Sequence, residues 1–282
     1  DGPAPPYSPH MPWLSGKDLA QTVRDGLKAR LIQEGLRPRL AVLLVGNDPA
    51  SMLYVGLKQR AAAEVGIDMI LRRETELEAG DALTIIEAWN ADPKIHGILV
   101  QLPLPAGMDT DAVIRAIDPA KDVDAFHPDN RAALIRGEAR VFSPVHLAVL
   151  RLIAETPLRL NGTATLLLAK SPVFSEPLAH LLRKAGAPVT IASAPPAEMA
   201  AFPLVITALG QAGALRGDGL HPEAVVIDIG TNRTSEGKTV GDFAAETIQP
   251  GQSVSAVPGG VGPLTIAFLL ENTVKACERK NP

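Results

Sequence analysis

The chain has 282 residues, of which 46% are hydrophobic and 21% are charged, and its formal net charge is −4. This length suffices for two domains with separate cores, and the composition is that of a globular protein rather than a disordered or fibrous one. The negative charge argues against a non-specific nucleic-acid binder, which needs a basic surface. Since no apolar run reaches the roughly 18 residues of a membrane span, we predict neither a nucleic-acid nor a membrane partner.

The first ten residues and the cysteine content bear on where the protein acts. Residues 1–10 are rich in proline and lack the charged and apolar regions of a signal peptide. We therefore expect a native start at Met11, with residues 1–10 as an extension or a cloning remnant. The single cysteine, Cys277, cannot form an intrachain disulfide, which suits a reducing compartment. A cytoplasmic location is the expectation.

The first half of the chain alternates between predicted strands and helices. Periodicity and turn signals predict helices over 16–34, 49–65, 81–92 and 109–117, and strands over 40–45, 67–72 and 96–101. This alternation indicates a parallel sheet with helical crossovers. The polar stretch 118–136 is expected to be a loop that approaches the inter-domain region.

A second alternating unit follows a predicted helix at 143–155. It comprises strands at 163–168, 188–192, 203–207 and 224–229, a helix at 174–185, and a short strand and turn at 238–242. The fold class predicted is α/β: an N-terminal parallel-sheet domain over 11–138, completed by a C-terminal helix at 264–280, and a Rossmann-like nucleotide-binding domain over 139–263.

One helix carries a candidate proton-handling pair. Gly46 to Pro49 ends the strand at 40–45, and Asp48 can cap a helix whose first position suits Pro49. Tyr54 and Lys58, four residues apart, share a face of this helix. A phenol beside an amine can move protons, although most helical lysines are solvated and the pair alone is a weak signal.

Three further candidates lie where ligands bind in parallel sheets, outside the carboxyl ends of the strands. They are Gln101, the segment Lys121–Asp124, and the turn Pro258–Pro263, whose three glycines allow a flat ligand to approach the backbone. Each has a structural alternative. Gln101 can satisfy loop amides, the aspartates can form Asx turns, and the glycine-rich segment can be a tight inter-domain turn.

Together these stretches resemble a known family. Segments 45–58, 97–105, 121–124 and 258–265 look like the signature stretches of the bifunctional methylenetetrahydrofolate dehydrogenase/methenyltetrahydrofolate cyclohydrolase family, and the match runs in order from about residue 11 to 276. The family oxidises 5,10-methylenetetrahydrofolate with NAD(P)⁺ and hydrolyses the methenyl product to 10-formyltetrahydrofolate. The resemblance implies a folate cleft between two domains and a homodimer formed through the second domain.

The resemblance also implies roles for individual residues. Lys58 would be the catalytic lysine, Gln101 would hydrogen-bond and tune it, Tyr54 would stack on the folate, and Asp124 would hold the pterin. A lysine beside a cationic substrate and shielded from water should have a lowered pKa, and a glutamine partner adds no charge to raise it. The folate site would be completed by Leu102, Pro258, Gly259 and Gly260.

The predicted dinucleotide loop departs from the family pattern Gly-Arg-Ser followed by Gly-x-Pro. Ala169 and Ser175 replace its two glycines, and each added Cβ crowds the approach to a pyrophosphate. Lys170 replaces the arginine and loses its forked geometry. Glu176 would repel a phosphate. Ala125 likewise stands where the family has glycine, and residues 142–146 replace a Cys-Thr-Pro-x-Gly segment.

The cofactor prediction is therefore NADP, with NAD or no cofactor as alternatives, and no metal. The segment after Ala192 lacks the basic residues expected near a 2′-phosphate. The predicted cofactor-binding residues are Ala169, Lys170, Ser171, Ser193 and Thr231. Three functions stay open: the bifunctional dehydrogenase/cyclohydrolase, a cyclohydrolase with weak or lost dehydrogenase activity, and a non-catalytic folate-binding protein.

Overall fold

The computed structural model describes residues 13–280, so the expected start at Met11 lies outside the described residues. The chain divides into two compact units. The first unit comprises residues 20–144 and 265–280, and the second comprises residues 13–19 and 145–264. No helix within residues 13–280 is long and apolar enough to cross a membrane.

The first unit is built on a three-stranded parallel sheet. Strand β2 (Arg39–Val45) lies between β3 (Asp68–Glu74) and β4 (Gly97–Val100). Six of the seven β2 residues are buried, which is why the strand appears in the sequence as a continuous apolar run. Its alternate residues enter two cores, with Leu40, Val42 and Leu44 in one and Ala41, Leu43 and Val45 in the other.

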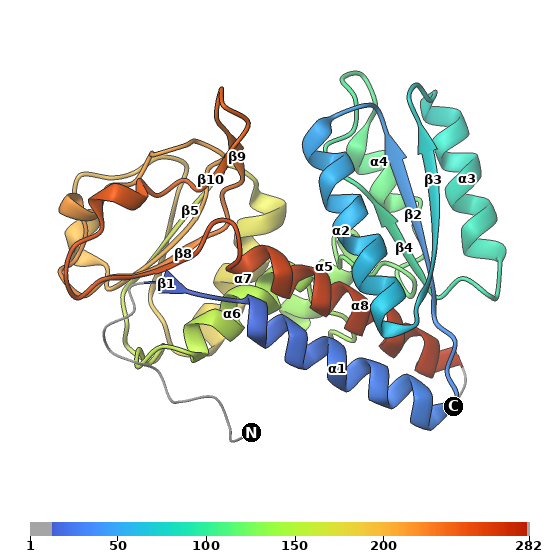
Figure 1. Cartoon of the computed structure of the whole chain (residues 1–282), viewed down its shortest axis with the longest axis horizontal. Helices are drawn as coiled ribbons and strands as arrows, with labels where there is room; N and C mark the ends of the chain where they lie inside the picture. The colour runs from blue at the N-terminus through green and yellow to red at the C-terminus, as the bar shows by residue number, and fades with distance from the viewer. Residues whose placement is uncertain (1–12, 281–282) are drawn as a thin grey trace. The chain divides into compact units, whose positions relative to one another are not determined.

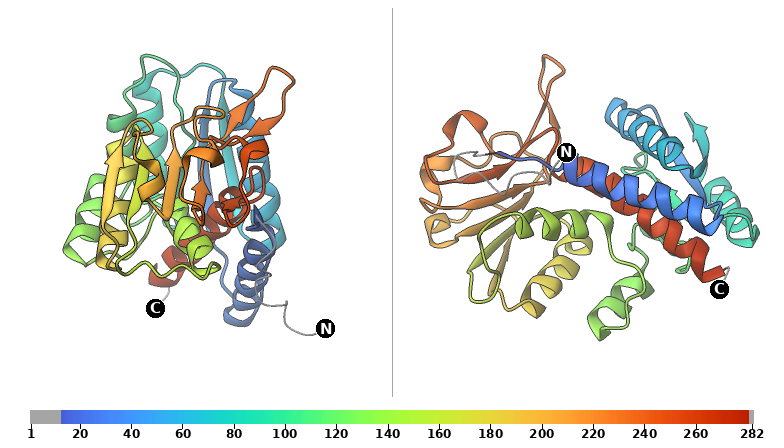
Figure 2. Two further views of the ribbon diagram at one scale, coloured as in Figure 1. Left: turned by 90° about the vertical axis from the view of Figure 1, so that its left-hand side faces the viewer. Right: turned by 60° about the horizontal axis from the view of Figure 1, so that its bottom comes forward.

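The helices of the first unit cover both faces of this sheet. The core that contains Leu40 also includes residues of α1 (Lys17–Glu34), α2 (Pro49–Val65) and α8 (Val261–Lys280). The core that contains Ala41 includes residues of α3 (Ala79–Ala91) and α4 (Thr110–Arg115). Helices α1 and α8 lie side by side (Figures 1 and 2), and Arg30 and Glu278 form an ion pair between them at 2.6 Å.

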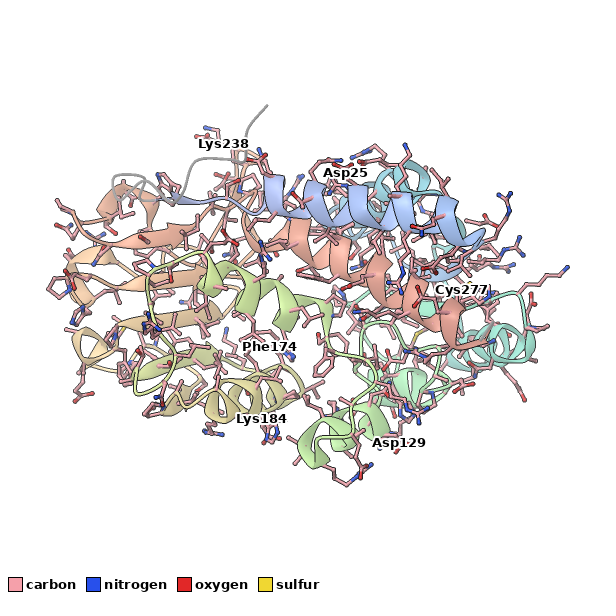
Figure 3. All side chains as sticks on the ribbon, turned by 90° about the horizontal axis from the view of Figure 1, so that it is seen from below. Asp25, Asp129, Phe174, Lys184, Lys238 and Cys277 are labelled. Carbon is pink, nitrogen blue, oxygen red and sulfur yellow. The ribbon has the colours of Figure 1, made fainter. Side chains whose placement is uncertain are left out.

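The second unit holds a six-stranded parallel sheet in the order β1-β11-β8-β7-β5-β6. Figures 2 and 3 show α6 (Pro144–Ala154) and α7 (Pro172–Lys184) side by side on one face. The hairpin of β9 (Asn232–Arg233) and β10 (Thr239–Val240) stands away from this sheet (Figure 1). The remaining elements are β1 (Trp13–Leu14), β5 (Thr165–Ala169), β6 (Val189–Ala192), β7 (Leu204–Ala208), β8 (Val225–Asp228), β11 (Ser253–Ser255), and the 3₁₀ turns Met199–Ala201, Gly217–Gly219 and Ala245–Thr247.

The predicted α/β class with parallel sheets is confirmed, one local expectation is corrected, two short strands were missed, and one domain boundary differs. The end of the stretch expected to be a loop forms helix α5 (Pro128–Arg136), with Pro128 in its first turn and Gly137 ending it at φ 77°. Its single buried residue, Leu134, gives no apolar periodicity to detect. Strands β1 and β11 were not predicted because runs of two and three residues are too short to show alternation. Through β1, residues 13–19 belong to the second unit.

A backbone feature marks the residue after Asp124. Ala125 is the one non-glycine residue with positive φ, at 59°, within the described range 13–280, and it is buried. Its position is the one where the family resemblance predicts glycine. A Cβ in this left-handed region crowds the following carbonyl oxygen, which costs about 1–2 kcal/mol.

We predict that Ala125→Gly raises the free energy of unfolding by up to about 1 kcal/mol. The relief of left-handed strain outweighs the greater entropy that glycine gives the unfolded chain. Urea denaturation followed by circular dichroism measures the change. Ala88→Gly, at an exposed position in α3 of the same unit, is the control and should cost about 1 kcal/mol. If both variants lose stability equally, Ala125 is not strained.

Candidate active site

Helix α2 presents Tyr54 and Lys58 one turn apart, and both side chains are half-buried. The helix begins as its sequence predicts, because the Asp48 carboxylate accepts the backbone N–H of Ser51 at 2.7 Å and Pro49 occupies the first turn. It ends at Gly66, which adopts φ 99°. The two caps fix which residues of α2 face the end of β4.

Lys58 is joined to the first residue beyond β4. Its Nζ donates a hydrogen bond to Oε1 of Gln101 at 2.8 Å. The Gln101 amide nitrogen donates to the carbonyl of Leu102 at 2.8 Å, and its backbone N–H donates to Leu43 of β2 at 2.9 Å. Both ends of the Gln101 side chain are therefore engaged, with the oxygen directed to the amine.

The segment Lys121–Asp124 divides into structural and candidate functional residues. Lys121 is buried, and its Nζ donates to the carbonyls of Trp89, Asn90 and Asp92, at the C-terminal end of α3. The Asp122 carboxylate accepts the N–H of His127 and the side-chain amide of Asn130. Asp122 is thus a turn residue, which agrees with the alternative interpretation that this aspartate stabilises a turn.

Lys58 and Asp124 interact electrostatically. Burial lowers the pKa of the Lys58 amine, and the Asp124 carboxylate opposes that shift. Burial raises the pKa of Asp124 to about 6, with the Lys58 charge opposing the shift and Asp122 adding to it. A desolvated amine with a lowered pKa can be neutral at a pH where an exposed lysine is not. The arrangement therefore provides a lysine able to accept and return a proton.

The glycine-rich turn lies in the second unit. The N–H of Gly16 donates to the carbonyl of Gly259 at 2.8 Å, and Gly259 adopts φ 114°. A Cβ on Gly260 would lie 2.7 Å from the carbonyl oxygen of Ala256. Gly259 therefore needs glycine because of its positive φ, and Gly260 because the Ala256 backbone leaves no room for a Cβ. Of the predicted folate residues, Tyr54, Lys58, Gln101, Leu102 and Asp124 belong to the first unit, and Pro258, Gly259 and Gly260 to the second.

The second unit has the strand order that creates a nucleotide site. In the sheet, β6 lies on one side of β5 and the next strand in the chain, β7, lies on the other side. The direction of strand addition therefore reverses between β5 and β7. Ligands bind outside the carboxyl ends of strands at such a point. Ala169 ends β5 and is buried, while Lys170 and Ser171 follow it and are exposed. Within the described chain no side chain caps the first turn of α7, which leaves an anion-binding helix end.

The other predicted cofactor residues lie at the same edge of this sheet. Leu168 of β5 pairs with Ala192 of β6, so Lys170 and Ser193 leave neighbouring strands at one end. Thr231 follows the end of β8, and both Ser193 and Thr231 are exposed. Ser175 is buried, whereas Glu176 is exposed beyond the first turn of α7. No group of three or more His, Cys, Asp and Glu side chains in residues 13–280 is arranged to hold a metal ion.

Sequence reasoning missed two buried carboxylates that organise this edge. Asp242 accepts hydrogen bonds from the Thr207 hydroxyl at 2.8 Å and the Leu209 N–H at 2.7 Å, which fixes the loop after β7. Asp228 accepts three backbone N–H groups, and burial raises its pKa to about 6. The position of Asp228 at the end of the apolar strand β8 was the available signal.

Comparisons with known proteins agree with this geometry. The sequence matches two family models, described as tetrahydrofolate dehydrogenase/cyclohydrolase, catalytic domain, over residues 14–124, and tetrahydrofolate dehydrogenase/cyclohydrolase, NAD(P)-binding domain, over residues 143–281. A relative from Acidiphilium cryptum, named bifunctional protein FolD, is 45% identical over 269 residues, which are 93% of this chain and 96% of the relative.

Two solved structures are similar over nearly the whole chain. The bifunctional enzyme FolD from Campylobacter jejuni is 36% identical with a TM-score of 0.89, over 95% of this chain and 99% of that one. The Trypanosoma brucei methylenetetrahydrofolate dehydrogenase-cyclohydrolase, solved with NADP and an inhibitor, is 28% identical with a TM-score of 0.88, over 95% and 98%.

The fold and site define a two-unit α/β enzyme with a desolvated lysine in one unit and an NAD(P)-binding domain as the other. The chain belongs to the tetrahydrofolate dehydrogenase/cyclohydrolase family, as the resemblance predicted.

We predict that Gln101→Glu shifts the acidic limb of the pH–rate profile for methenyltetrahydrofolate hydrolysis to higher pH. A carboxylate bonded to Lys58 raises the pKa of the amine, so less neutral amine is present at pH 7. Rates are measured from pH 5.5 to 8.5 after subtraction of spontaneous hydrolysis. Gln101→Met, which removes the hydrogen bond without adding charge, is the control and should not move the limb upward. Identical profiles for both variants would show that Gln101 does not tune Lys58.

Proposed function

We propose that this chain oxidises 5,10-methylenetetrahydrofolate with NADP⁺ and hydrolyses the resulting 5,10-methenyltetrahydrofolate to 10-formyltetrahydrofolate. The observation that carries the proposal is the 2.8 Å bond from Lys58 to Gln101, in a site where burial lowers the pKa of the amine and Asp124 opposes that shift. A non-catalytic folate binder would need no such amine, and the similar proteins from Campylobacter jejuni and Trypanosoma brucei are described as dehydrogenase/cyclohydrolases.

In the hydrolytic step, neutral Lys58 acts as the base and then as the acid. As the oxygen of water bonds to the cationic methenyl carbon, Lys58 takes a proton from that water. The bond from this carbon to N5 breaks, its electron pair stays on N5, and the proton reaches N5 from Lys58. The remaining hydroxyl proton passes to solvent as the C=O bond of the formyl group on N10 forms, and the amine is neutral again. Gln101 directs the amine throughout, because its oxygen is already bonded to Nζ.

The remaining folate contacts are proposed from the family resemblance. Asp124 would hydrogen-bond the pterin, and Tyr54 would stack on and orient the folate. Leu102, Pro258, Gly259 and Gly260 would line the substrate. We also propose a homodimer and a cytoplasmic location on the same basis.

The second unit's carboxyl edge fits a dinucleotide, whose role when bound is to accept a hydride from the methylene carbon. The open N-terminus of α7 suits the pyrophosphate, with Ala169 and Ser171 beside it. Exposed Lys170 and Ser193 suit the 2′-phosphate of NADP, and Thr231 lies farther along the same edge. Ser193-Ala194-Pro195 follows β6 without the acidic residue that favours NAD by binding the ribose 2′-hydroxyl.

A cyclohydrolase with weak dehydrogenase activity is the second candidate. Ala169 and Ser175 carry side chains where the family loop has glycines, and both are buried. Measuring NADPH formation at 340 nm beside methenyl hydrolysis on one preparation separates the two functions. Hydrolysis without NADPH formation would establish the second candidate and reject the first.

We predict that Lys58→Met lowers the rate of methenyl hydrolysis by about two to four orders of magnitude while folate still binds. The variant should be no less stable than the parent at pH 7, because it removes an amine that burial destabilises when charged. The unfolded chain holds the Lys58 proton more tightly than the folded chain, so the parent gains stability as pH rises toward 10.5 and the difference between them narrows. Retained hydrolysis would contradict the role of Lys58.

We predict that Lys170→Ala lowers kcat/KM for NADP⁺ about tenfold and changes kcat/KM for NAD⁺ less than twofold. The loss is that of a charge-assisted contact to the 2′-phosphate, which NAD⁺ lacks. Lys184→Ala, an exposed lysine at the far end of α7, is the control and should change neither value. An equal loss with both cofactors would place Lys170 away from the 2′-phosphate.

A further inference from the structure

One buried side chain near the nucleotide edge has no role in the chemistry described above. His146, in the first turn of α6, is 1% exposed, and no side chain among residues 13–280 forms a hydrogen bond with its ring. Burial lowers its pKa to about 4, a shift that a hydrogen bond with the Phe174 backbone opposes, so the ring is neutral at physiological pH. The polar and the aromatic contact of the ring therefore both belong to one residue of α7, Phe174.

The His146 ring packs against an aromatic ring of α7. The centroids of His146 and Phe174 lie 5.1 Å apart with their planes at 54°, a tilted arrangement that aromatic pairs favour. Phe174 is the third residue of α7 and faces α6 (Figure 3). The pair therefore connects the first turn of α6 to the first turn of α7.

The first turn of α7 is the part of this helix that a pyrophosphate would meet. The Ser171 carbonyl accepts hydrogen bonds from the backbone N–H groups of Phe174 at 3.2 Å and Ser175 at 2.9 Å. A shift of Phe174 would therefore move the Ser171 backbone as well. Ser175 is buried beside it. Because Ala169 and Ser175 carry side chains, the packing around the loop helps to set its backbone position, and the His146–Phe174 contact is part of that packing.

We propose that the His146–Phe174 contact is a positioning element for the dinucleotide: it holds the first turn of α7 where the N–H of Val173 can bind the pyrophosphate. The proposal rests on the proposed use of NADP. His146 and Phe174 act through Ser171 and the helix end rather than by touching the cofactor.

The test is the equilibrium binding of NADP⁺, measured by titration calorimetry on the full chain. His146→Gly leaves a void beside Phe174, and Phe174→Ala leaves one beside His146. Each should weaken NADP⁺ binding about tenfold, since a displaced N–H loses a hydrogen bond to a charged phosphate, an effect of about this size. His146→Leu restores apolar volume and should bind like the parent. The double variant His146→Gly/Phe174→Ala should lose no more than either single variant, because both remove one contact.

Two controls separate positioning from general loss of structure. Phe202→Ala truncates an aromatic residue that precedes β7 and packs in the core with Val205 and Phe243; it should lower stability without changing the affinity for NADP⁺. Methenyl hydrolysis should stay within twofold of the parent in all variants, because Lys58, Gln101 and Asp124 belong to the first unit. In dehydrogenase assays KM for NADP⁺ should rise and kcat should not.

Unchanged NADP⁺ binding in His146→Gly would overturn the proposal. So would a loss in His146→Leu equal to that in His146→Gly, because volume would then not be what matters. If the parent itself binds no NADP⁺, the proposed dehydrogenase function fails together with this inference. If the parent binds and the variants do as well, only the positioning role fails.

Discussion

The chemistry proposed for this protein depends on keeping the Lys58 amine away from water without giving it a strong ionic partner. Desolvation lowers its pKa, and a carboxylate bonded to the amine would reverse that effect. The fold provides an amide, Gln101, at bonding distance, and it leaves Asp124 to act through space. The same burial raises the pKa of Asp124 to about 6. The charge of each group therefore opposes the pKa shift that burial causes in the other, and a further charge nearby would change both pKa values.

This balance requires Asp124 to be held by groups other than Lys58. Lys121 binds three carbonyls at the end of α3, and Asp122 closes the turn onto His127 and Asn130. Asn272 of α8 adds a bond of 2.8 Å to the carbonyl of Val123. Three of the segment's four residues are thus held by hydrogen bonds, so Asp124 needs no ion pair for its position. This leaves its carboxylate available for the pterin contact proposed above.

The parts of this arrangement that follow from local physics were predictable from the sequence. The apolar run of β2 predicts a buried strand, and Asp48, Pro49 and Gly66 predict the limits of α2 and the shared face of Tyr54 and Lys58. The parts that depend on distant partners were not predictable. Whether an aspartate forms a turn or faces an amine depends on the groups opposite it, which is why Asp122 and Asp124 could not be distinguished. Asp242 was missed because its partners Thr207 and Leu209 lie more than thirty residues away.

The proposed sites of the two units differ in the substitutions they can tolerate, and the reason is physical. In the first unit Lys58, Gln101 and Asp124 are mutually dependent, since a change of charge in one shifts the pKa of another. In the second unit the proposed ligand contacts are mainly backbone groups at a helix end, whose geometry many side-chain combinations can support. Replacing glycine by Ala169 and Ser175 alters that support without removing a single N–H group. An aromatic contact elsewhere on α7 can restore the position of the backbone, whereas no packing change can replace a proton-carrying amine.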